Sequence, residues 1–202
     1  MGQESQRTAL YDHHVAAGAR MVDFAGWDMP VNYGSQIDEH HAVRQSAGMF
    51  DVSHMTAVDI RGTQVIPFLQ YLLANNVATI QPGKAIYSCM LNEQGRVIDD
   101  LIAYYMSDTW FRLVVNAGTT DKDIAWIEKQ ATNFDDVQVE PRKELCILAI
   151  QGPQAREKFC SLLDAAEAEK VQAMKIFSAA ELKDYFVGRT GYTGEDGVEV
   201  IL

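Results

Sequence analysis

Apolar residues recur at helical spacing in several stretches of the chain. After Thr63, apolar side chains three and four residues apart share one face of a helix, namely Val65, Ile66, Leu69, Leu72 and Leu73. Pro67 is tolerated there because the first turn of a helix does not need its amide hydrogen. The same periodicity predicts helices at residues 8–17, 36–46, after Thr119 or Thr120, and after Gly152 and Pro153.

Polar residues in front of these stretches predict where the helices begin. Ser35, with Asp38 three residues later, resembles a capping box at the start of a helix. Thr63 is expected to cap the next helix in the same way. Pro153 suits the first position of a later helix, which is expected to turn Leu162 toward the interior.

Alternating or continuous apolar runs predict the strands. These runs lie at residues 55–61, 85–91, 96–105, 110–115, 137–139, 145–150, 186–189 and 198–202. The turns at 92–95 and 107–109 are short enough to join three of the strands into an antiparallel meander. Residues 21–34 form an extended segment punctuated by Gly, Trp and Pro.

The order of these elements predicts an α+β fold with mostly antiparallel sheets and packed helices, because hairpins replace strict strand–helix alternation. We expect an N-terminal α+β part at residues 1–142 and the start of a second α+β domain at 143–202. The sequence stops in an apolar strand that ends at Leu202 without a polar tail. Since natural termini are usually solvated, we expect that the second domain is truncated and that the C-terminal part of a larger protein is absent.

Composition narrows the class of protein. Among 202 residues, 17 are Lys or Arg and 28 are Asp or Glu, which gives a formal net charge of −11. This acidity argues against a nucleic-acid partner, because binding to the phosphate backbone requires clustered cations. No apolar stretch approaches the roughly 20 residues that span a bilayer, so we expect no membrane association.

The cysteines and the N-terminus indicate the compartment. The three cysteines, Cys89, Cys146 and Cys160, are widely spaced and form no C-x-x-C pair, so a disulfide scaffold and a structural zinc site are both disfavoured. We interpret them as reduced core thiols. The N-terminus lacks the apolar region of a secretory signal. A cytoplasmic location fits these features best.

Familiar catalytic motifs are absent. The sequence contains no dinucleotide-binding glycine pattern, no P-loop, no H-E-x-x-H and no G-x-S-x-G. The adjacent pairs His13-His14 and His40-His41 do not make a two-ligand face, because neighbours on a helix point about a hundred degrees apart. We therefore interpret His40 and His41 as polar helix surface rather than as metal ligands with Asp38, and we expect no metal.

Two adjacent acids interrupt an apolar strand, at Asp99 and Asp100. Because side chains alternate along a strand, the two carboxylates lie on opposite faces and only one can enter a given cavity. A carboxylate on an apolar face is costly unless it is hydrogen-bonded or used chemically. Alternation alone does not decide which of the two is the functional one.

A glycine-rich run at residues 188–199 admits two interpretations. Glycines at intervals of three suit a hairpin turn, with residues 195–197 at the bend. Such a loop also lets the backbone approach a ligand, with Tyr192 as an aromatic wall and Glu199 as a hydrogen-bond acceptor. The aromatic segment at 23–30 is equally compatible with a lid or with a core.

Several segments together resemble the T-protein family of the glycine cleavage system, which are aminomethyltransferases. The resemblance is carried by DFAGWDMP at 23–30, MFDVSHM at 49–55, IDDLI at 98–102, VVNA at 114–117, LAIQGP at 148–153 and GYTGEDG at 191–197. These motifs occur in family order across nearly the whole chain. The segment YGSQIDEHHAVR at 33–44 is most similar to the bacterial proteins.

The resemblance implies a folate-binding aminomethyltransferase fold and a reaction. The aminomethyl group on the lipoylated H protein is transferred to tetrahydrofolate, giving 5,10-methylenetetrahydrofolate, ammonia and the dihydrolipoyl H protein. By position in the family motifs, Asp99 is the catalytic carboxylate and Glu199 holds the pterin ring. The resemblance assigns the remaining pocket wall to Tyr192, Tyr87, Met55, Val114 and Asn116.

Two other readings remain open within the same superfamily. One is the folate-binding domain of a sarcosine or dimethylglycine oxidoreductase, although the family-like start of the chain disfavours an added flavin domain. The other is a non-catalytic folate-binding protein of iron–sulfur assembly. Such relatives generally lack the Asp99 motif and the glycine run at 191–197 together, whereas this chain has both.

Overall fold

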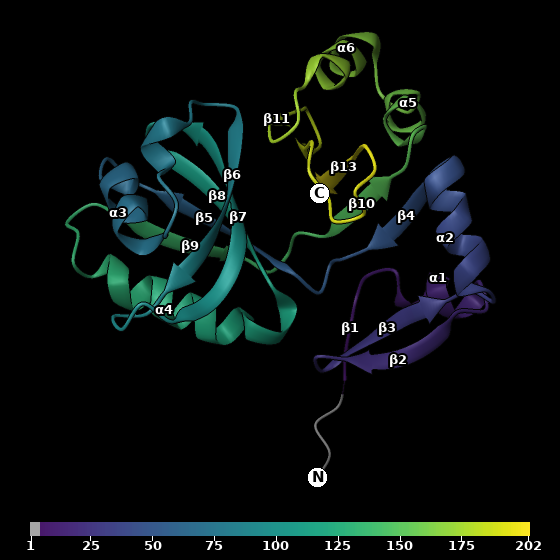
Figure 1. Cartoon of the computed structure of the whole chain (residues 1–202), viewed down its shortest axis with the longest axis horizontal. Coiled ribbons are helices and arrows are strands. Elements are labelled where there is room, and N and C mark those ends of the chain that lie inside the picture. The colour runs from purple at the N-terminus through teal and green to yellow at the C-terminus, as the bar shows by residue number, and fades with distance from the viewer. Residues whose placement is uncertain (1–4) are drawn as a thin grey trace. The chain divides into compact units, whose positions relative to one another are not determined.

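The computed structural model describes residues 5–202, which form two compact units (Figure 1). The first unit comprises residues 5–54, Cys146–Ile176 and Glu181–Leu202, and the second comprises Met55–Leu145 and Phe177–Ala180. The α+β fold with mostly antiparallel sheets is confirmed. Among the described residues, no helix is both long and apolar enough to span a membrane.

The second unit is built on a five-stranded antiparallel sheet in the order β6-β7-β8-β5-β9. The strand bounds are β5 Thr56–Arg61, β6 Lys84–Leu91, β7 Val97–Ser107, β8 Trp110–Val115 and β9 Gln138–Arg142. The predicted meander of three consecutive strands is confirmed as β6-β7-β8. Two short 3-10 helices, η1 Val77–Thr79 and η2 Ala117–Thr119, complete the connections.

The helices α3 (Val65–Leu72) and α4 (Thr120–Ala131) pack against one face of this sheet and enclose the core. The side chains of Phe68 and Ile127 on the helices meet Leu101 and Phe111 on the strands, and all four are fully buried. The apolar face expected for the helix after Thr63 is therefore the face that α3 buries.

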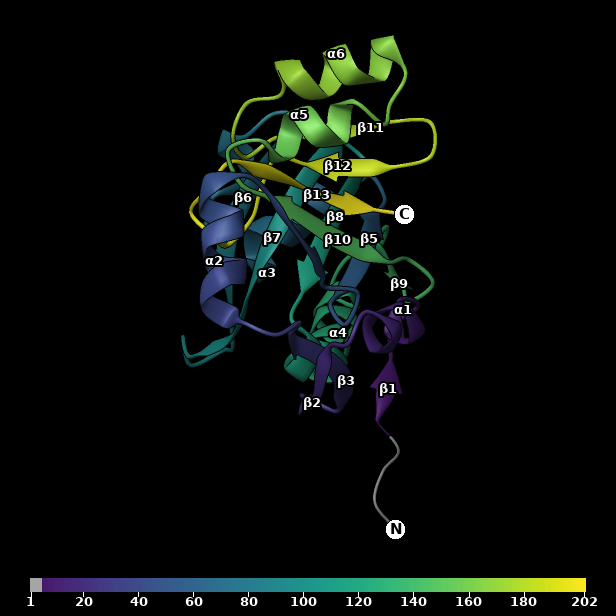
Figure 2. The ribbon, with the colours of Figure 1, turned by 90° about the vertical axis from the view of Figure 1, so that its right-hand side faces the viewer.

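Four strands of a second five-stranded sheet lie in the first unit, and the order of the whole sheet is β11-β12-β13-β10-β4 (Figure 2 shows β12, β13 and β10 side by side). Its strands are β4 Gly48–Asp51, β10 Ile147–Gln151, β11 Ala179–Glu181, β12 Phe186–Gly188 and β13 Gly197–Ile201. Helix α5 (Ala155–Cys160) packs against β10 and β13, and α6 (Ala165–Ala173) packs against α5. Every residue of β13 is buried, as expected for a strand in the middle of a covered sheet.

A small sheet near the N-terminus completes the first unit. It consists of β1 (Gln6–Arg7), β2 (Arg20–Phe24) and β3 (Trp27–Asn32) in the order β1-β3-β2, followed by α2 (Gln36–Gln45), with α1 (Tyr11–Ala16) between β1 and β2. The extended segment expected at 21–34 is thus a hairpin. Ala25 and Gly26, both with positive φ, form its two-residue turn.

The compact units differ from the expected division at residues 142 and 143. The cause is the pairing of β4 with β10, in which Met49 lies opposite Ile150. This pairing joins an N-terminal segment to the C-terminal sheet across about a hundred residues of sequence. Hydrophobic periodicity carries no information on such long-range pairing, and β4 itself was not predicted.

The predicted helix starts are partly confirmed. Ser35 caps α2, since its hydroxyl accepts a hydrogen bond from the Asp38 amide. Thr63 does not cap α3. Its amide and hydroxyl both donate to the Asp136 carboxylate, a distant partner that the sequence does not reveal.

The helix expected from Pro153 begins two residues later and is short. Helix α5 ends at Cys160, so Leu162 lies beyond it and is 81% exposed, contrary to the prediction that it turns inward. A separate helix, α6, follows and was not predicted. Of the cysteines, Cys160 is buried, Cys89 and Cys146 are half-buried, and all three are free thiols.

Candidate functional site

One face of the sheet in the second unit packs against α3 and α4, and the opposite face carries several of the expected site residues. In β7, Leu101 belongs to the core beneath the helices, so Asp100 and Ile102 project from the opposite face. Ile102 is paired with Tyr87 on one neighbouring strand and with Val114 on the other. Tyr87, Asp100 and Val114 therefore share one face of the sheet.

Tyr87 and Asp100 form a hydrogen-bonded pair on this face. The Tyr87 hydroxyl donates to Oδ2 of Asp100, and this hydrogen bond, followed by burial, raises the pKa of Tyr87 to about 12. The phenol consequently stays protonated at neutral pH and keeps the carboxylate oriented. Tyr87 is 44% exposed, so solvent and ligands can reach the pair.

Asp99 lies on the other face, beside the start of α4. It is paired with Met90, a fully buried residue of the core. The Thr119 hydroxyl donates to its Oδ2 over 2.6 Å, and the Asn116 amide donates to its two oxygens over 3.1 and 3.2 Å. Burial acts to raise the pKa of Asp99, but the hydrogen bonds from Asp123, Thr119 and Asn116 outweigh burial and lower it.

Asp123 is a second acid beside Asp99, and it is fully buried. Among the described residues, no group within hydrogen-bond geometry donates to its carboxyl oxygens, and the Thr119 hydroxyl, whose hydrogen bond goes to Asp99, is the nearby donor that acts to lower its pKa. Burial, and then the neighbouring Asp99 carboxylate, raise the pKa of Asp123 to about 7. A protonated Asp123 that donates to the Asp99 carboxylate satisfies both acids.

The structure brings Asp99 together with Asn116 and separates it from Tyr87 and Val114. The side chain that shares a face with Tyr87 and Val114 is that of Asp100, whereas Asp99 is held by α4 and its preceding turn. Asn116, expected at the pocket wall, uses its amide for Asp99 and for the Asp100 carbonyl oxygen at 3.0 Å. Thr119, expected as a possible helix cap, makes no side-chain cap and binds Asp99.

The remaining expected residues lie at the start of the second unit and in the first unit. Met55 directly precedes β5 and is half-buried. Tyr192 lies in the loop between β12 and β13 and is 65% exposed. Glu199 lies within β13.

Glu199 is a buried acid, only 5% exposed, in the middle of the first unit's sheet. In the register, its neighbours are Gly188 on β12 and Ala149 on β10, which are both small. The Thr190 hydroxyl donates a hydrogen bond to Oε2 of Glu199. The carboxylate is thus fixed by Thr190 and is not crowded by the neighbouring strands.

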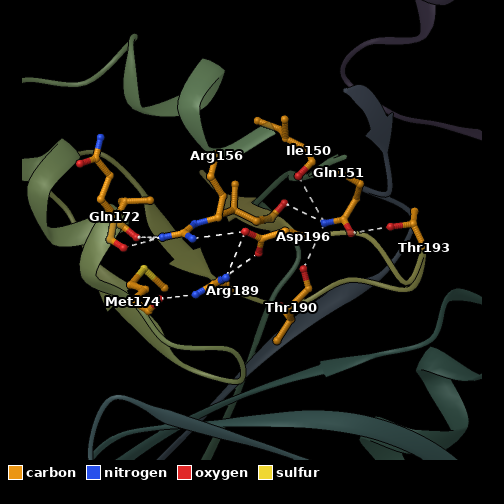
Figure 3. Close-up of polar contacts among 11 residues, drawn as sticks. Ile150, Gln151, Arg156, Gln172, Met174, Arg189, Thr190, Thr193 and Asp196 are labelled. Atoms are coloured by element: carbon orange, nitrogen blue, oxygen red, sulfur yellow. Dashed lines mark hydrogen bonds and ion pairs between the residues drawn. The ribbon is translucent and has the colours of Figure 1, made fainter. Parts of the chain in front are cut away.

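Close packing against Gln151 shapes the glycine-rich loop between β12 and β13 (Figure 3). A Cβ atom added to Gly191 would come within 2.1 Å of Oε1 of Gln151, and one added to Gly197 within 2.6 Å of its Nε2. Both distances are far shorter than a van der Waals contact, so only glycine fits at these two positions. The run joins two antiparallel strands, as the hairpin interpretation predicts, but Gly197 already belongs to β13 and not to the bend.

Asp196 anchors the other end of the same loop. Figure 3 shows its carboxylate between two guanidinium groups, with Arg189 at 2.9 and 3.0 Å and Arg156 at 3.3 Å. Burial acts to raise the pKa of Asp196, but the hydrogen bonds from Arg189 and Arg156 outweigh it and lower the pKa. The arginines also donate to backbone carbonyls of Val171, Gln172 and Met174, which ties the loop to the end of α6.

His14, in the first of the two histidine pairs, is buried. His14 forms a chain with two partners, since its Nε2 lies 2.9 Å from Oδ2 of Asp51 and its Nδ1 lies 2.7 Å from the Tyr33 hydroxyl. The surface interpretation holds for His40 and His41, which are exposed. Within the described part of the chain, no cluster of three or more His, Cys, Asp and Glu residues is arranged to hold a metal ion.

The sequence model of the GCVT N-terminal domain matches residues 10–202. The chain belongs to the GCVT N-terminal domain family. It is 57% identical to an aminomethyltransferase of Alcanivorax borkumensis over 198 residues, which cover 98% of this chain and 55% of that protein. The chain thus spans about half the length of this curated relative.

Solved structures support membership of the GCVT family. The glycine cleavage system aminomethyltransferase T from Bartonella henselae matches with a TM-score of 0.89 and 37% identity, over 98% of this chain and 53% of that one. A heterotetrameric sarcosine oxidase from Corynebacterium matches with a TM-score of 0.54 and 12% identity, over 82% of both chains. The second match shows a shared fold and nothing more.

Several residues of the site were not found from the sequence. Gln151 lies in the LAIQGP segment that carries the family resemblance. The sequence therefore indicates that this segment matters, but it does not indicate what the Gln151 side chain contacts. Thr190 and Asp123 carry no sequence signal of their own. Their importance arises only from their contacts with Glu199 and Asp99.

Proposed function

We propose that the protein is the tetrahydrofolate-dependent aminomethyltransferase of the glycine cleavage system. The observation that carries this proposal is the GCVT family match over residues 10–202, together with 57% identity to an aminomethyltransferase. The substrates would be the aminomethylated lipoyl arm of the H protein and tetrahydrofolate. The products would be 5,10-methylenetetrahydrofolate, ammonia and the dihydrolipoyl H protein.

The chemistry of this transfer requires groups that accept and hold protons. Folate nitrogens N5 and N10 each lose one proton as each bonds to the transferred carbon. The carbon–nitrogen and carbon–sulfur bonds of the aminomethyl group break, and the two protons end on ammonia and on the lipoyl thiol. A carboxylate near the folate nitrogens assists by electrostatic stabilisation and by accepting a proton.

Asp100 is the acid best placed for that role in the second unit. It lies on the same face as Tyr87 and Val114, two residues expected at the pocket wall. The Tyr87 hydroxyl orients its carboxylate. We therefore assign the catalytic carboxylate to Asp100. We assign Asp99 a structural role, in which it ties β7 to the start of α4. The Asn116 amide contacts both acids, through the Asp99 carboxylate and the Asp100 carbonyl oxygen.

Glu199 supports the proposal in the first unit. A carboxylate can accept two hydrogen bonds side by side, which suits the amino group and ring N–H of a pterin. Thr190 already fixes one of its oxygens, so the carboxylate is oriented before a ligand binds. Tyr192, in the same unit, offers an exposed ring for stacking. Met55 and Val114 belong to the second unit and offer apolar surface there.

The proposal includes the setting in which the protein works. We propose a cytoplasmic enzyme that uses no metal and has neither a nucleic-acid nor a membrane partner. A folate-binding domain of a sarcosine or dimethylglycine oxidoreductase is less well supported, because the similarity to sarcosine oxidase extends only to the fold. No observation favours a non-catalytic iron–sulfur assembly protein.

The test is transfer of the aminomethyl group from H protein to tetrahydrofolate by the intact protein. Asp100→Asn is expected to lower kcat about a hundredfold or more, because removal of a general base typically costs that much. Asp99→Asn, the matched control on the opposite face, is expected to lower kcat less than tenfold. An equal or larger loss in Asp99→Asn would return the catalytic role to Asp99.

A second measurement addresses the pterin anchor. Glu199→Gln keeps the size of the side chain and replaces one acceptor oxygen by a donor, so tetrahydrofolate binding measured by calorimetry is expected to weaken at least tenfold. Glu195→Gln, in the same loop, serves as the control. Unchanged folate affinity in Glu199→Gln would contradict the anchor role.

A further inference from the structure

Gln151 is the most buried polar side chain of the first unit that the proposed reaction does not use. It is 1% exposed, at the end of β10. A buried carboxamide is retained only where its donors and acceptor are satisfied, because an unpaired polar group in the interior is costly. Its partners therefore show what the side chain holds together.

All partners of the Gln151 carboxamide belong to its own strand, the glycine-rich loop and β13 (Figure 3). Its Nε2 lies 3.1 Å from the Thr190 carbonyl oxygen, 3.3 Å from that of Ile150 and 3.4 Å from that of Val198. Its Oε1 accepts a hydrogen bond from the Thr193 hydroxyl over 3.0 Å. One side chain thus connects both ends and the middle of the loop.

The backbone of the loop packs closely against the Gln151 side chain. Gly191 and Gly197 approach the carboxamide so closely that a methyl group at either position would overlap it. The loop carries Tyr192 at its exposed side, directly after the two residues Thr190 and Gly191 that contact Gln151. The orientation of Tyr192 therefore depends on a backbone that Gln151 holds.

The contact with Thr190 extends to Glu199. Gln151 binds the Thr190 carbonyl, and the hydroxyl of the same residue donates to the Glu199 carboxylate. The Val198 carbonyl, another acceptor of Gln151, directly precedes Glu199 in β13. Gln151 is thus linked to Glu199 in two ways: through Thr190, which contacts both residues, and through the backbone of Val198, which is bonded to Glu199.

We propose that Gln151 is a positioning residue for ligand binding, which fixes the glycine-rich loop and, through Thr190, the carboxylate of Glu199. This inference rests on the proposed function in one respect, namely that Glu199 and Tyr192 contact the folate. Because Gln151 is itself buried, the proposal assigns it no contact with the ligand. Its contribution is to hold a binding site in shape before the ligand arrives.

The test compares Gln151→Met, which keeps the length of the side chain and removes both polar groups, with Gln130→Met. Gln130 is also a buried glutamine, but it lies on α4 in the second unit, so its variant controls for a general loss of stability. In Gln151→Met, amide hydrogen exchange in residues 190–197 is expected to accelerate at least tenfold. In Gln130→Met, exchange in this loop is expected to stay at the wild-type rate.

Binding and kinetics give the second measurement on the intact protein. Gln151→Met is expected to weaken tetrahydrofolate binding about tenfold and to raise KM for folate with little change in kcat. Losses of about this size are typical when a residue that orients the ligand-contacting groups is removed. A merely structural role would not separate KM from kcat in this way. Folate affinity and loop exchange equal to those of Gln130→Met would overturn the proposal.

A milder pair of variants applies if Gln151→Met does not fold. Thr190→Val removes the hydroxyl that links the loop to Glu199 and is expected to weaken folate binding, whereas Thr190→Ser keeps the hydroxyl and is expected to restore it. Equal binding by the two variants would count against the proposal. Absence of folate binding in the wild type would instead refute the proposed function, while the exchange comparison would still decide whether Gln151 holds the loop.

Discussion

At the scale of single residues, the most informative contrast is between Asp99 and Asp100. Strand alternation correctly predicts that the two carboxylates lie on opposite faces, but it does not say which face carries the site. The pairing of Ile102 with Tyr87 and Val114 shows that Asp100 shares their face, and for this reason we propose that face for the site. Similarly, the burial of His14 and the role of Gln151 depend on partners far away in sequence.

Asp123 gives a prediction on pH. Its folded-state pKa is raised to about 7, so between its ordinary value of 3.8 and about 7 the folded protein binds a proton that the unfolded chain has released. The free energy of unfolding therefore falls as pH rises through this window. Burial and then Asp99 raise the pKa of Asp123, whereas the Thr119 hydroxyl and, to a lesser extent, the Lys122 charge lower it.

In Asp123→Asn this pH-dependent loss of stability should disappear. Denaturant unfolding at pH 5 and pH 8 is expected to show a decrease for the wild type, on the order of 3 kcal/mol, that is absent in the variant. Asp121→Asn, an exposed change in the same helix turn, is the control. A wild type with the same pH dependence as Asp123→Asn would show that Asp123 ionises normally.

At the scale of elements, local signals succeed where the partner is near in sequence. The cap that Ser35 provides for α2, the meander β6-β7-β8 and the apolar face of α3 were all predicted and are confirmed. The predicted cap at Thr63 is wrong because Asp136 competes for its hydroxyl. The missed strand β4 is short and depends on β10 for its hydrogen bonds, whereas the missed helix α6 buries only Val171 and so has no apolar face in its sequence.

The cap at Ser35 can be tested directly. Ser35→Ala removes the acceptor for the Asp38 amide and is expected to lower the free energy of unfolding by about 1 kcal/mol, measured by denaturant titration. Ser35→Asp keeps an acceptor at the same position and is expected to retain wild-type stability. A loss of the same size in both variants would mean that the cap contributes nothing.

At the scale of the whole molecule, the chain path determines which pieces can fold alone. The second unit is nearly continuous, since only Phe177–Ala180 come from elsewhere in the sequence. Residues 55–145 expressed alone are expected to unfold cooperatively by circular dichroism. Residues 146–202 alone are expected to lack a cooperative transition, because they leave the edge of β10 without β4. The opposite result would favour a linear division near residue 142.

The α+β class, most helices and strands and the family follow from the sequence alone, which also proposes a set of site residues. These properties depend on periodicity, caps, turns and motifs. Each of these signals involves residues that are close together in the sequence. Only the tertiary structure decided that Asp100 shares a face with Tyr87, that Gln151 holds the loop beside Glu199, and that β4 belongs with β10. Each of these depends on strand register or on burial between distant segments, which no local pattern specifies.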